Sequence, residues 1–163
     1  MPFAALTSDF QINLESIWNV RNSFVPFGAV GIAPRYNFDG YVLGRGGEEN
    51  NGYTQIFRNG VIEATKSPIV RLREGNHLVI PGIGVEQHIF EKLHIYFDGL
   101  QAIGVPPPFL VSFVFEGVKG AVYAVRPNGY DDPPPPIDRD ILYLPECFIE
   151  NFGTRTEYHK AAT

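Results

Sequence analysis

The alternation of apolar and polar residues is most regular between residues 85 and 103. At ~100° per residue, the apolar side chains fall on one stripe roughly 120° wide: Val85, Ile89, Leu93, Tyr96, Phe97, Leu100 and Ile103. Polar residues lie opposite, Gly104 follows where helices commonly end, and the prolines at 106–108 prevent continuation. The pattern predicts one long amphipathic helix, about 85–103, packed across a sheet.

A second pattern, with period two, surrounds Asn59-Gly60 in the stretch GYTQIFRNGVIEAT, residues 52–65. Asn-Gly favours a two-residue type I′ turn, because both central positions need positive φ. That turn places Phe57 opposite Ile62 and Gln55 opposite Ala64. We expect the core face to carry Tyr53, Gln55, Phe57, Ile62 and Ala64, and the other face to carry Ile56, Arg58, Val61 and Glu63.

Shorter patterns predict the remaining elements. Apolar spacing from Phe10 to Val25 indicates a helix near 9–22, capped by Ser8 or Asp9. Short strands are expected at 38–43 (or a turn at Asp39-Gly40), at 69–72 and at 77–80. Residues 109–115 are almost all apolar, which predicts a central strand buried on both faces and returning through 121–125 as a hairpin. Residues 141–149 suggest a last strand broken at Pro145.

These elements indicate an α+β fold: a mostly antiparallel sheet of about five to seven strands, the long helix (about 85–103) packed on it, and an N-terminal helix. The 163 residues suffice for a single domain, 1–163, with its own core. Residues 1–9 are expected to be a tail or linker remnant, and residues 154–163 a frayed tail.

Composition narrows the classes of function. The net charge of −5 disfavours nucleic-acid binding, which depends on clustered Lys and Arg. Cys147 is the single cysteine, so an internal disulfide and a CxxC metal site are excluded. No apolar run approaches the length of a membrane span, and the first residues lack the pattern of a signal peptide. We therefore expect a cytoplasmic protein with no membrane partner.

Pro81-Gly82-Ile83-Gly84 precedes the long helix and is the candidate ligand site. Glycines before a helix N-terminus can hold a phosphate, because free N–H groups and the helix dipole favour an anion. Gln87 stands where a third glycine of the dinucleotide pattern would be, however, and no Lys-Ser/Thr pair follows. Gly82 and Gly84 are therefore weak phosphate or ligand candidates, and a plain tight turn is the favoured interpretation.

Three other groups of side chains are candidates for a catalytic or metal site, and each has a simpler interpretation. Glu91, His94 and Asp98 share a polar helix face, but a second Glu-x-x-His motif is missing. Asp131, Asp132, Asp138 and Asp140 flank four prolines without EF-hand spacing, in a stretch that could also be a proline-rich ligand. Cys147 could pair with His77, His88 or His159, although a cysteine in an apolar strand is usually a packing residue. We predict no catalytic residue, metal or cofactor.

Arginines beside aromatics suggest a surface for a macromolecular partner. The candidate residues are Arg35, Tyr36, Phe38, Arg71 and Arg73. Tyr and Arg are enriched at protein–protein interfaces, whereas nucleic-acid binding is disfavoured by the acidic balance. Ordinary packing at a sheet edge is the alternative, and the exposed aromatics are compatible with a homodimer.

Several stretches together resemble a bacterial protein family: GYTQIFRNGVIEAT, then the amphipathic helix, then LQAIGVPPPFLVSFVFEGVKG and PIDRDILYLPECFIENF. Over residues 36–153 the chain is similar to the C-terminal region of proteins that begin with an AlbA-like, Schlafen-type DNA-binding domain, often labelled ATP-binding. The resemblance implies a C-terminal domain of a longer protein, a transcriptional regulator with the DNA-binding domain in cis. The resemblance does not assign a functional role to any residue of this chain.

Two functions are expected from these observations. The first is a non-enzymatic sensing or protein-interaction domain of a bacterial regulator, because no catalytic constellation is present. The alternative is a small-molecule (nucleotide-like) binding domain or cryptic enzyme, with a pocket between the long helix and the sheet.

Overall fold

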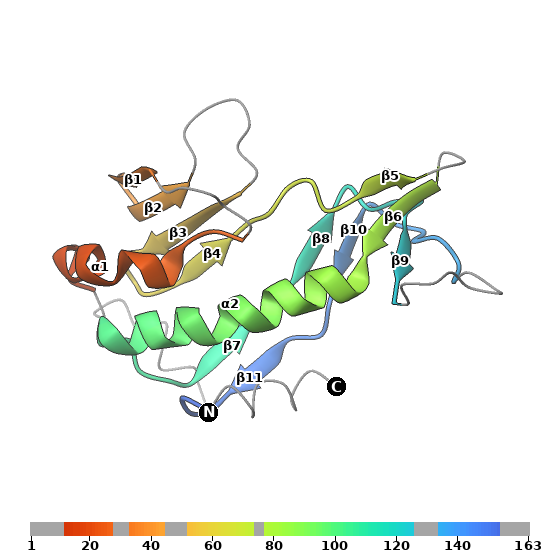
Figure 1. The fold of residues 1–163 in the computed structure, drawn as a ribbon. Helices are drawn as coiled ribbons and strands as arrows, with labels where there is room; N and C mark the ends of the chain where they lie inside the picture. The colour runs from red at the N-terminus through yellow and green to blue at the C-terminus, as the bar shows by residue number, and fades with distance from the viewer. Residues whose placement is uncertain (1–11, 28–32, 45–51, 74–76, 126–133, 154–163) are drawn as a thin grey trace.

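A computed structural model describes residues 12–27, 33–44, 52–73, 77–125 and 134–153 (Figure 1). The helices are α1 (Leu14–Val20), a following 3-10 helix (Arg21–Phe24) and α2 (Gly82–Ala102). The strands are β1 (Ala33–Tyr36), β2 (Gly40–Gly44), β3 (Tyr53–Phe57), β4 (Ile62–Ala64), β5 (Arg71–Arg73), β6 (His77–Pro81), β7 (Phe109–Val111), β8 (Val114–Glu116), β9 (Val122–Ala124), β10 (Ile141–Tyr143) and β11 (Cys147–Ile149). The α+β class with one long helix and an N-terminal helix is confirmed.

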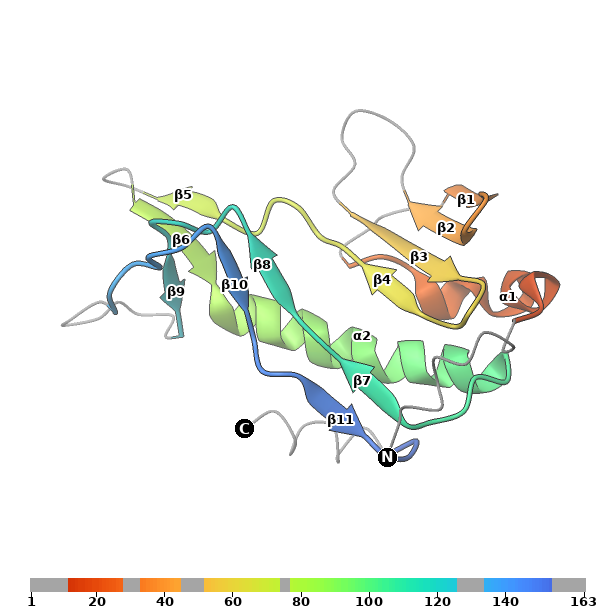
Figure 2. The same ribbon diagram turned by 180° about the vertical axis from the view of Figure 1, so that it is seen from behind.

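The strands are distributed among four small sheets rather than collected in one. Their orders are β1-β2-β3-β4, β5-β6-β9, β8-β10 and β7-β11, and among the strands in the described ranges only the β6–β9 pair is parallel. A helix of 21 residues is about 31 Å long, whereas a strand of five residues spans roughly 17 Å. Successive small sheets therefore lie along α2, with β1–β4 near its C-terminal end and β5-β6-β9 at its N-terminal end (Figures 1 and 2).

Two hydrophobic cores result from this arrangement, and α2 contributes to both. The first core joins the C-terminal half of α2 to α1, β2 and β3, and its fully buried members are Ile17, Phe24, Tyr41, Leu43 and Ile56. The second core lies at the other end of α2 and contains Ile80, Phe115, Val118 and Ala121. The apolar stripe predicted for the helix is thus confirmed, but it covers two cores in succession.

A buried hydrogen-bonded tyrosine ties α2 to the first core. The Tyr96 hydroxyl donates to the Val25 carbonyl (3.2 Å) and, since a carbonyl only accepts, receives the Thr54 hydroxyl (3.2 Å). Burial raises the pKa of Tyr96 to about 12, although the Thr54 hydrogen bond works in the opposite direction. These bonds place Thr54 of β3 on the core side of its strand.

The ends of both helices follow local sequence signals. α1 begins at Leu14 rather than near residue 9, because the Asn13 side-chain oxygen accepts the Glu15 N–H (2.9 Å) and caps it. The proposed caps Ser8 and Asp9 lie outside the described residues.

α2 starts at Gly82, three residues before the predicted start. It ends in a Schellman motif at Gly104, whose φ is +81°, with Val105 N–H donating to the Leu100 carbonyl (2.9 Å). Within the described ranges, no helix is long and apolar enough to cross a bilayer.

The β3–β4 hairpin has a different turn from the predicted one. Ile56 pairs with Ile62, so the pairing is shifted by one residue. The Phe57 N–H donates to the Val61 carbonyl (2.8 Å), the Gly60 N–H donates to the Phe57 carbonyl (3.0 Å), and Gly60 has φ +85°. These bonds define a three-residue loop, a type I turn closed by a left-handed glycine, instead of a two-residue type I′ turn.

The shifted register exchanges the two faces of β3, so the predicted core face is wrong for that strand: Thr54 and Ile56 are fully buried, whereas Tyr53 and Phe57 are only half-buried. Gln55 is nevertheless buried, and the prediction is confirmed for β4, where Ile62 and Ala64 pack against the first core. A one-residue slip moves every side chain of a strand to the other face. Packing of Ile56 into the first core therefore selects the three-residue loop, although Asn-Gly itself is compatible with either turn.

Residues 109–115 do not form a strand buried on both faces, and they do not pair with 121–125. β7 and β8 pair with β11 and β10 and make a two-stranded ribbon along α2, while β9 pairs with β6 (Figure 2). Phe109 stacks on Phe97 of α2 at 5.0 Å between ring centroids, but Leu110 is 53% exposed. The predicted break at Pro145 is confirmed, since it separates β10 from β11.

Candidate ligand pocket

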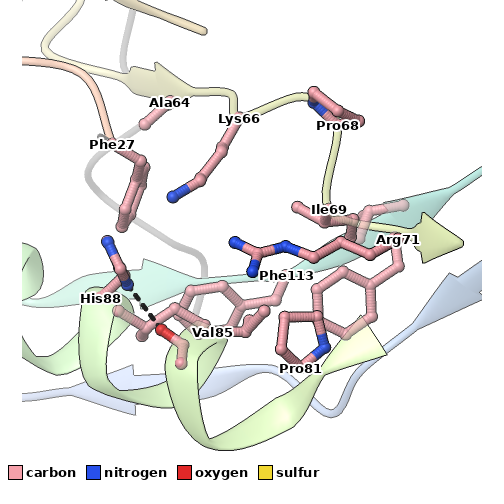
Figure 3. Close-up of a pocket in the computed structure, with 14 residues that line it drawn as sticks. Phe27, Ala64, Lys66, Pro68, Ile69, Arg71, Pro81, Val85, His88 and Phe113 are labelled. Atoms are coloured by element: carbon pink, nitrogen blue, oxygen red, sulfur yellow. Dashed lines mark hydrogen bonds between the residues drawn. The ribbon is translucent and has the colours of Figure 1, made fainter. Parts of the chain in front are cut away.

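A pocket of about 240 Å³ lies where the two cores meet (Figure 3). The connection between β4 and β5 forms one wall, the first turns of α2 form another, and the junction of β7 with β8 forms a third. The apolar lining comes from both cores: Phe27 and Ala64 pack against the first, and Ile69, Val85 and Phe115 belong to the second.

Helical spacing explains why one side of α2 faces the pocket. Gly84, Val85, His88 and Ile89 line it. Two adjacent pairs, 84–85 and 88–89, follow each other four residues apart, which places them on one helix face. Lys66 and Ile69 come from the chain segment that crosses from the first sheet to the second. The pocket is therefore a product of the two-core arrangement and not of any single element.

Every charged residue in the lining is basic. Lys66 and Arg71 extend their cationic groups into the same space, and the lining residues that the structure describes include no carboxylate (Figure 3). Among the described residues, the ion pair that forms is Asp138 with Arg139 at 2.8 Å, so neither pocket cation has an acidic partner there. Lys66 is half-buried and Arg71 is exposed, so both cationic groups remain accessible to an anion that enters the pocket.

His88 adds a further polar group to the pocket. Its Nδ1 lies 2.6 Å from the Gly84 carbonyl oxygen, and because a carbonyl only accepts, Nδ1 carries the hydrogen. The second ring nitrogen, Nε2, remains on the pocket side of the ring (Figure 3). It accepts a hydrogen bond when the ring is neutral and donates one when the ring is protonated.

The structure separates the roles of the two candidate glycines. A Cβ on Gly82 would lie 2.4 Å from Tyr123 Cε1 and 2.8 Å from the Ala124 carbonyl oxygen, so Gly82 permits close packing of α2 on β9. A Cβ on Gly84 would meet nothing within 4 Å, and Gly84 lines the pocket. Ligand contact thus remains a prediction that the geometry favours for Gly84, whereas Gly82 has a packing role.

The start of α2 also holds an acid. The Glu86 carboxylate accepts a hydrogen bond from the Tyr123 hydroxyl (3.0 Å). Burial, together with this bond and the negative charge of Glu86, raises the pKa of Tyr123 to about 12. A carboxylate in the first two turns reduces the attraction of the helix N-terminus for a phosphate.

The five residues proposed as an interaction surface do not form one patch. Arg35 and Tyr36 lie in β1, and Phe38, 93% exposed, follows them in the turn to β2. Arg71 and Arg73 lie in β5, near the other end of α2 (Figure 1). Partner binding through either group stays a prediction, and Arg71 is also a pocket residue.

The other candidates remain dispersed. Across the described residues, no three His, Cys, Asp or Glu side chains gather where a metal ion could bind. His94 Nδ1 lies 3.1 Å from the Phe90 carbonyl oxygen, and Cys147 is paired with Val111 in the ribbon. Asp140 is exposed before β10. Asp131, Asp132 and His159 lie outside the described residues.

Sequence reasoning missed Lys66 altogether and considered His88 only as a partner of Cys147. A usable signal was present in residues 64–73, ATKSPIVRLR, which carry three basic residues and no acid within an acidic chain. Glu63 and Glu74 flank this stretch, so its positive charge is local. A local cluster of basic residues is typical of an anion-binding surface.

Comparisons with protein-family models, with curated proteins and with solved structures find no match to this chain. The evidence on function therefore comes from the geometry and charge of the pocket.

Proposed function

We propose that this chain is a small-molecule-binding domain that senses a ligand in the pocket between its two cores. The observation that carries the proposal is an apolar cavity of about 240 Å³ into which Lys66, Arg71 and His88 converge. Ligand pockets typically combine apolar walls with a few polar groups that fix orientation. A ligand here would contact both cores and α2 at once, so binding would stabilise their arrangement.

Binding, rather than catalysis, is the activity that this lining supports. Among the described residues that line the pocket there is no Ser, Thr, Cys, Asp or Glu, so this part of the lining holds none of the usual nucleophile–base pairs. Lys66 alone would need a neighbouring group to activate it as a nucleophile. In the cytoplasmic bacterial regulator that the sequence resemblance implies, such a domain would report the ligand to a DNA-binding domain in cis.

A pocket-filling variant tests the proposal directly. A fragment library is screened by thermal shift against the wild-type protein and against Gly84→Leu, whose added side chain enters open space. A ligand at 100 times its Kd adds about 2.7 kcal/mol, which corresponds to roughly 5–10 °C in Tm for a chain of this size. Gln87→Leu, on an exposed position outside the lining, is the control. Hits that shift Gly84→Leu as much as wild type would refute the site.

A second candidate function, protein interaction, is favoured by the outer face of the ribbon. Cross-strand partners Leu110 and Phe148 are 53% and 54% exposed, and Tyr143 is 72% exposed. Exposed apolar clusters mark interaction surfaces. The neighbouring exposed acids Glu116 and Glu146 favour a basic partner surface over a second copy of the chain.

Titration with amphipathic peptides distinguishes this candidate from the pocket. A lysine-rich amphipathic peptide should perturb NMR signals of β7 and β11, and its glutamate-rich counterpart should not. Phe148→Lys should abolish the effect, whereas Gly84→Leu should leave it unchanged. Equal perturbation by both peptides would contradict the electrostatic part of the argument.

A further inference from the structure

We infer that the pocket ligand is a small carboxylate with an apolar body, held with its carboxylate between Lys66 and Arg71. This inference rests on the proposed function and adds the chemical class of the ligand. The size of the pocket, the sign of its charges and the position of its polar groups support it separately.

The volume limits the ligand to a small metabolite. An apolar cavity of about 150 Å³ accommodates benzene, so a pocket of about 240 Å³ accommodates roughly ten non-hydrogen atoms by the same scaling. A phenyl or branched aliphatic acid has this size. The pocket is open to solvent on one side, so a mononucleotide would extend out of it, whereas a small acid fills it; the volume therefore favours the small acid over the nucleotide-like ligand expected from the sequence.

The charges select an anion. Lys66 and Arg71 are both positively charged, and the described lining of the pocket holds no carboxylate. A bound anion would give each cation a partner that the described residues do not supply. The guanidinium fork of Arg71 matches the two oxygens of a carboxylate, and the ammonium of Lys66 supplies a further donor.

The arrangement of the walls determines which end of the ligand lies where. The cations enter from the β4–β5 connection and from β5, whereas Val85 of α2 and Phe113 of the ribbon form the apolar floor (Figure 3). The carboxylate therefore faces the β4–β5 connection and the apolar body faces α2. His88 Nε2 lies beside this body and can bond a hydroxyl or carbonyl substituent.

A carboxylate is favoured over a phosphate for two reasons. The first N–H groups of α2 would bind a phosphate, but Gly82, which carries the first of them, is buried against Tyr123 and Ala124, and of the first three helix residues Gly84 is the one in the described lining. Glu86, in the second turn, adds negative charge near that end. The charged donors toward the pocket are side-chain cations, which suffice for one negative charge.

Matched acids and amides test the inference. Benzoate, phenylacetate and cyclohexanecarboxylate, each beside its primary amide, are titrated against the wild-type protein by isothermal calorimetry and ligand-observed NMR. We expect each acid to bind about ten-fold more tightly than its amide, the effect of a charge-assisted hydrogen bond. Lys66→Met and Arg71→Met should each weaken acid binding about ten-fold and leave amide binding unchanged. Arg73→Met, two residues along β5 and outside the lining, should bind as wild type does.

The outcomes separate the inference from the proposed function. If amides bind as tightly as acids and Gly84→Leu blocks both, the carboxylate inference is overturned and the proposed function stands. If inorganic phosphate competes as well as the acids do, the apolar body is unnecessary and the ligand class is wrong. If neither acids nor amides bind and the fragment screen yields no hit that Gly84→Leu abolishes, both proposals are overturned. Far-UV circular dichroism of each variant confirms that it is folded.

Discussion

The packing of α2 on the 3-10 helix depends on one glycine, and adding a single methyl group there tests the model of the first core. A Cβ on Gly99 would lie 2.6 Å from Phe24 Cζ, 2.8 Å from Phe24 Cε1 and 2.8 Å from Ser23 Cβ. Phe24 is fully buried and stacked on Tyr96 at 6.3 Å between ring centroids. Any displacement of the Phe24 ring would therefore disturb its contact with Tyr96 inside the first core.

Two opposing effects set the magnitude for Gly99→Ala. Replacing a glycine inside a helix with alanine gains about 0.5–1 kcal/mol from propensity, whereas overpacking a buried contact costs about 1–3 kcal/mol. The net expectation is a loss of about 1–2 kcal/mol, or roughly 2–8 °C in Tm. Gly84→Ala adds the same methyl group on the same helix in open space, so it should stabilise by up to about 0.5–1 kcal/mol.

Urea denaturation followed by circular dichroism measures both variants against the wild type. The midpoint should fall for Gly99→Ala and rise for Gly84→Ala, with unchanged m-values, since neither substitution alters the surface exposed on unfolding. If Gly99→Ala is as stabilising as Gly84→Ala, the close approach of α2 to Phe24 does not exist, and the reasoning about the first core is refuted.

Three further predictions concern side chains of the first core and the start of α1. Tyr41 is fully buried and its hydroxyl lacks a hydrogen-bond partner among the described residues, so Tyr41→Phe should raise the unfolding free energy by about 1 kcal/mol; a loss in urea denaturation would contradict this. Tyr96 has a pKa of about 12 in the folded state and 10.0 as a free group. The contribution of protonated Tyr96 to the free energy of unfolding is therefore complete below pH 10, and it decreases by about 2.7 kcal/mol as the pH rises through 12. In Tyr96→Phe the free energy of unfolding should therefore decline less steeply at alkaline pH, which a series of urea midpoints at different pH values measures. Asn13→Ala removes the α1 cap and should cost about 1 kcal/mol, whereas Asn13→Asp should retain most of the stability in the same assay; equal loss in both would argue against capping.

Part of the pocket was accessible to sequence reasoning and part was not. Gly84 was named as a ligand candidate, and Arg71 as a surface cation, from their local contexts. Lys66 became a pocket residue only because the β4–β5 connection passes over α2, a contact between segments about twenty residues apart (Figure 3). No local pattern encodes such a contact, although the acid-free basic stretch around it is visible in the sequence.

The sequence alone determined the features that depend on neighbouring residues. The apolar stripe of α2 and its end at Gly104 follow from helical spacing and from the tolerance of glycine for positive φ. The break at Pro145, between β10 and β11, also follows from local chemistry, because proline cannot donate to a ladder.

Tertiary structure decided the turn type, the strand register and the strand partners, because the local sequence is compatible with more than one alternative for each. Asn59-Gly60 permits either turn, and burial of Ile56 in the first core selected the three-residue loop. β9 (122–124) could have paired with β8, its neighbour in sequence. It pairs instead with β6, parallel to it, after the chain has crossed over through α2. Register and partner choice are set by how much apolar surface each alternative buries, and that quantity exists only once the distant elements have come together.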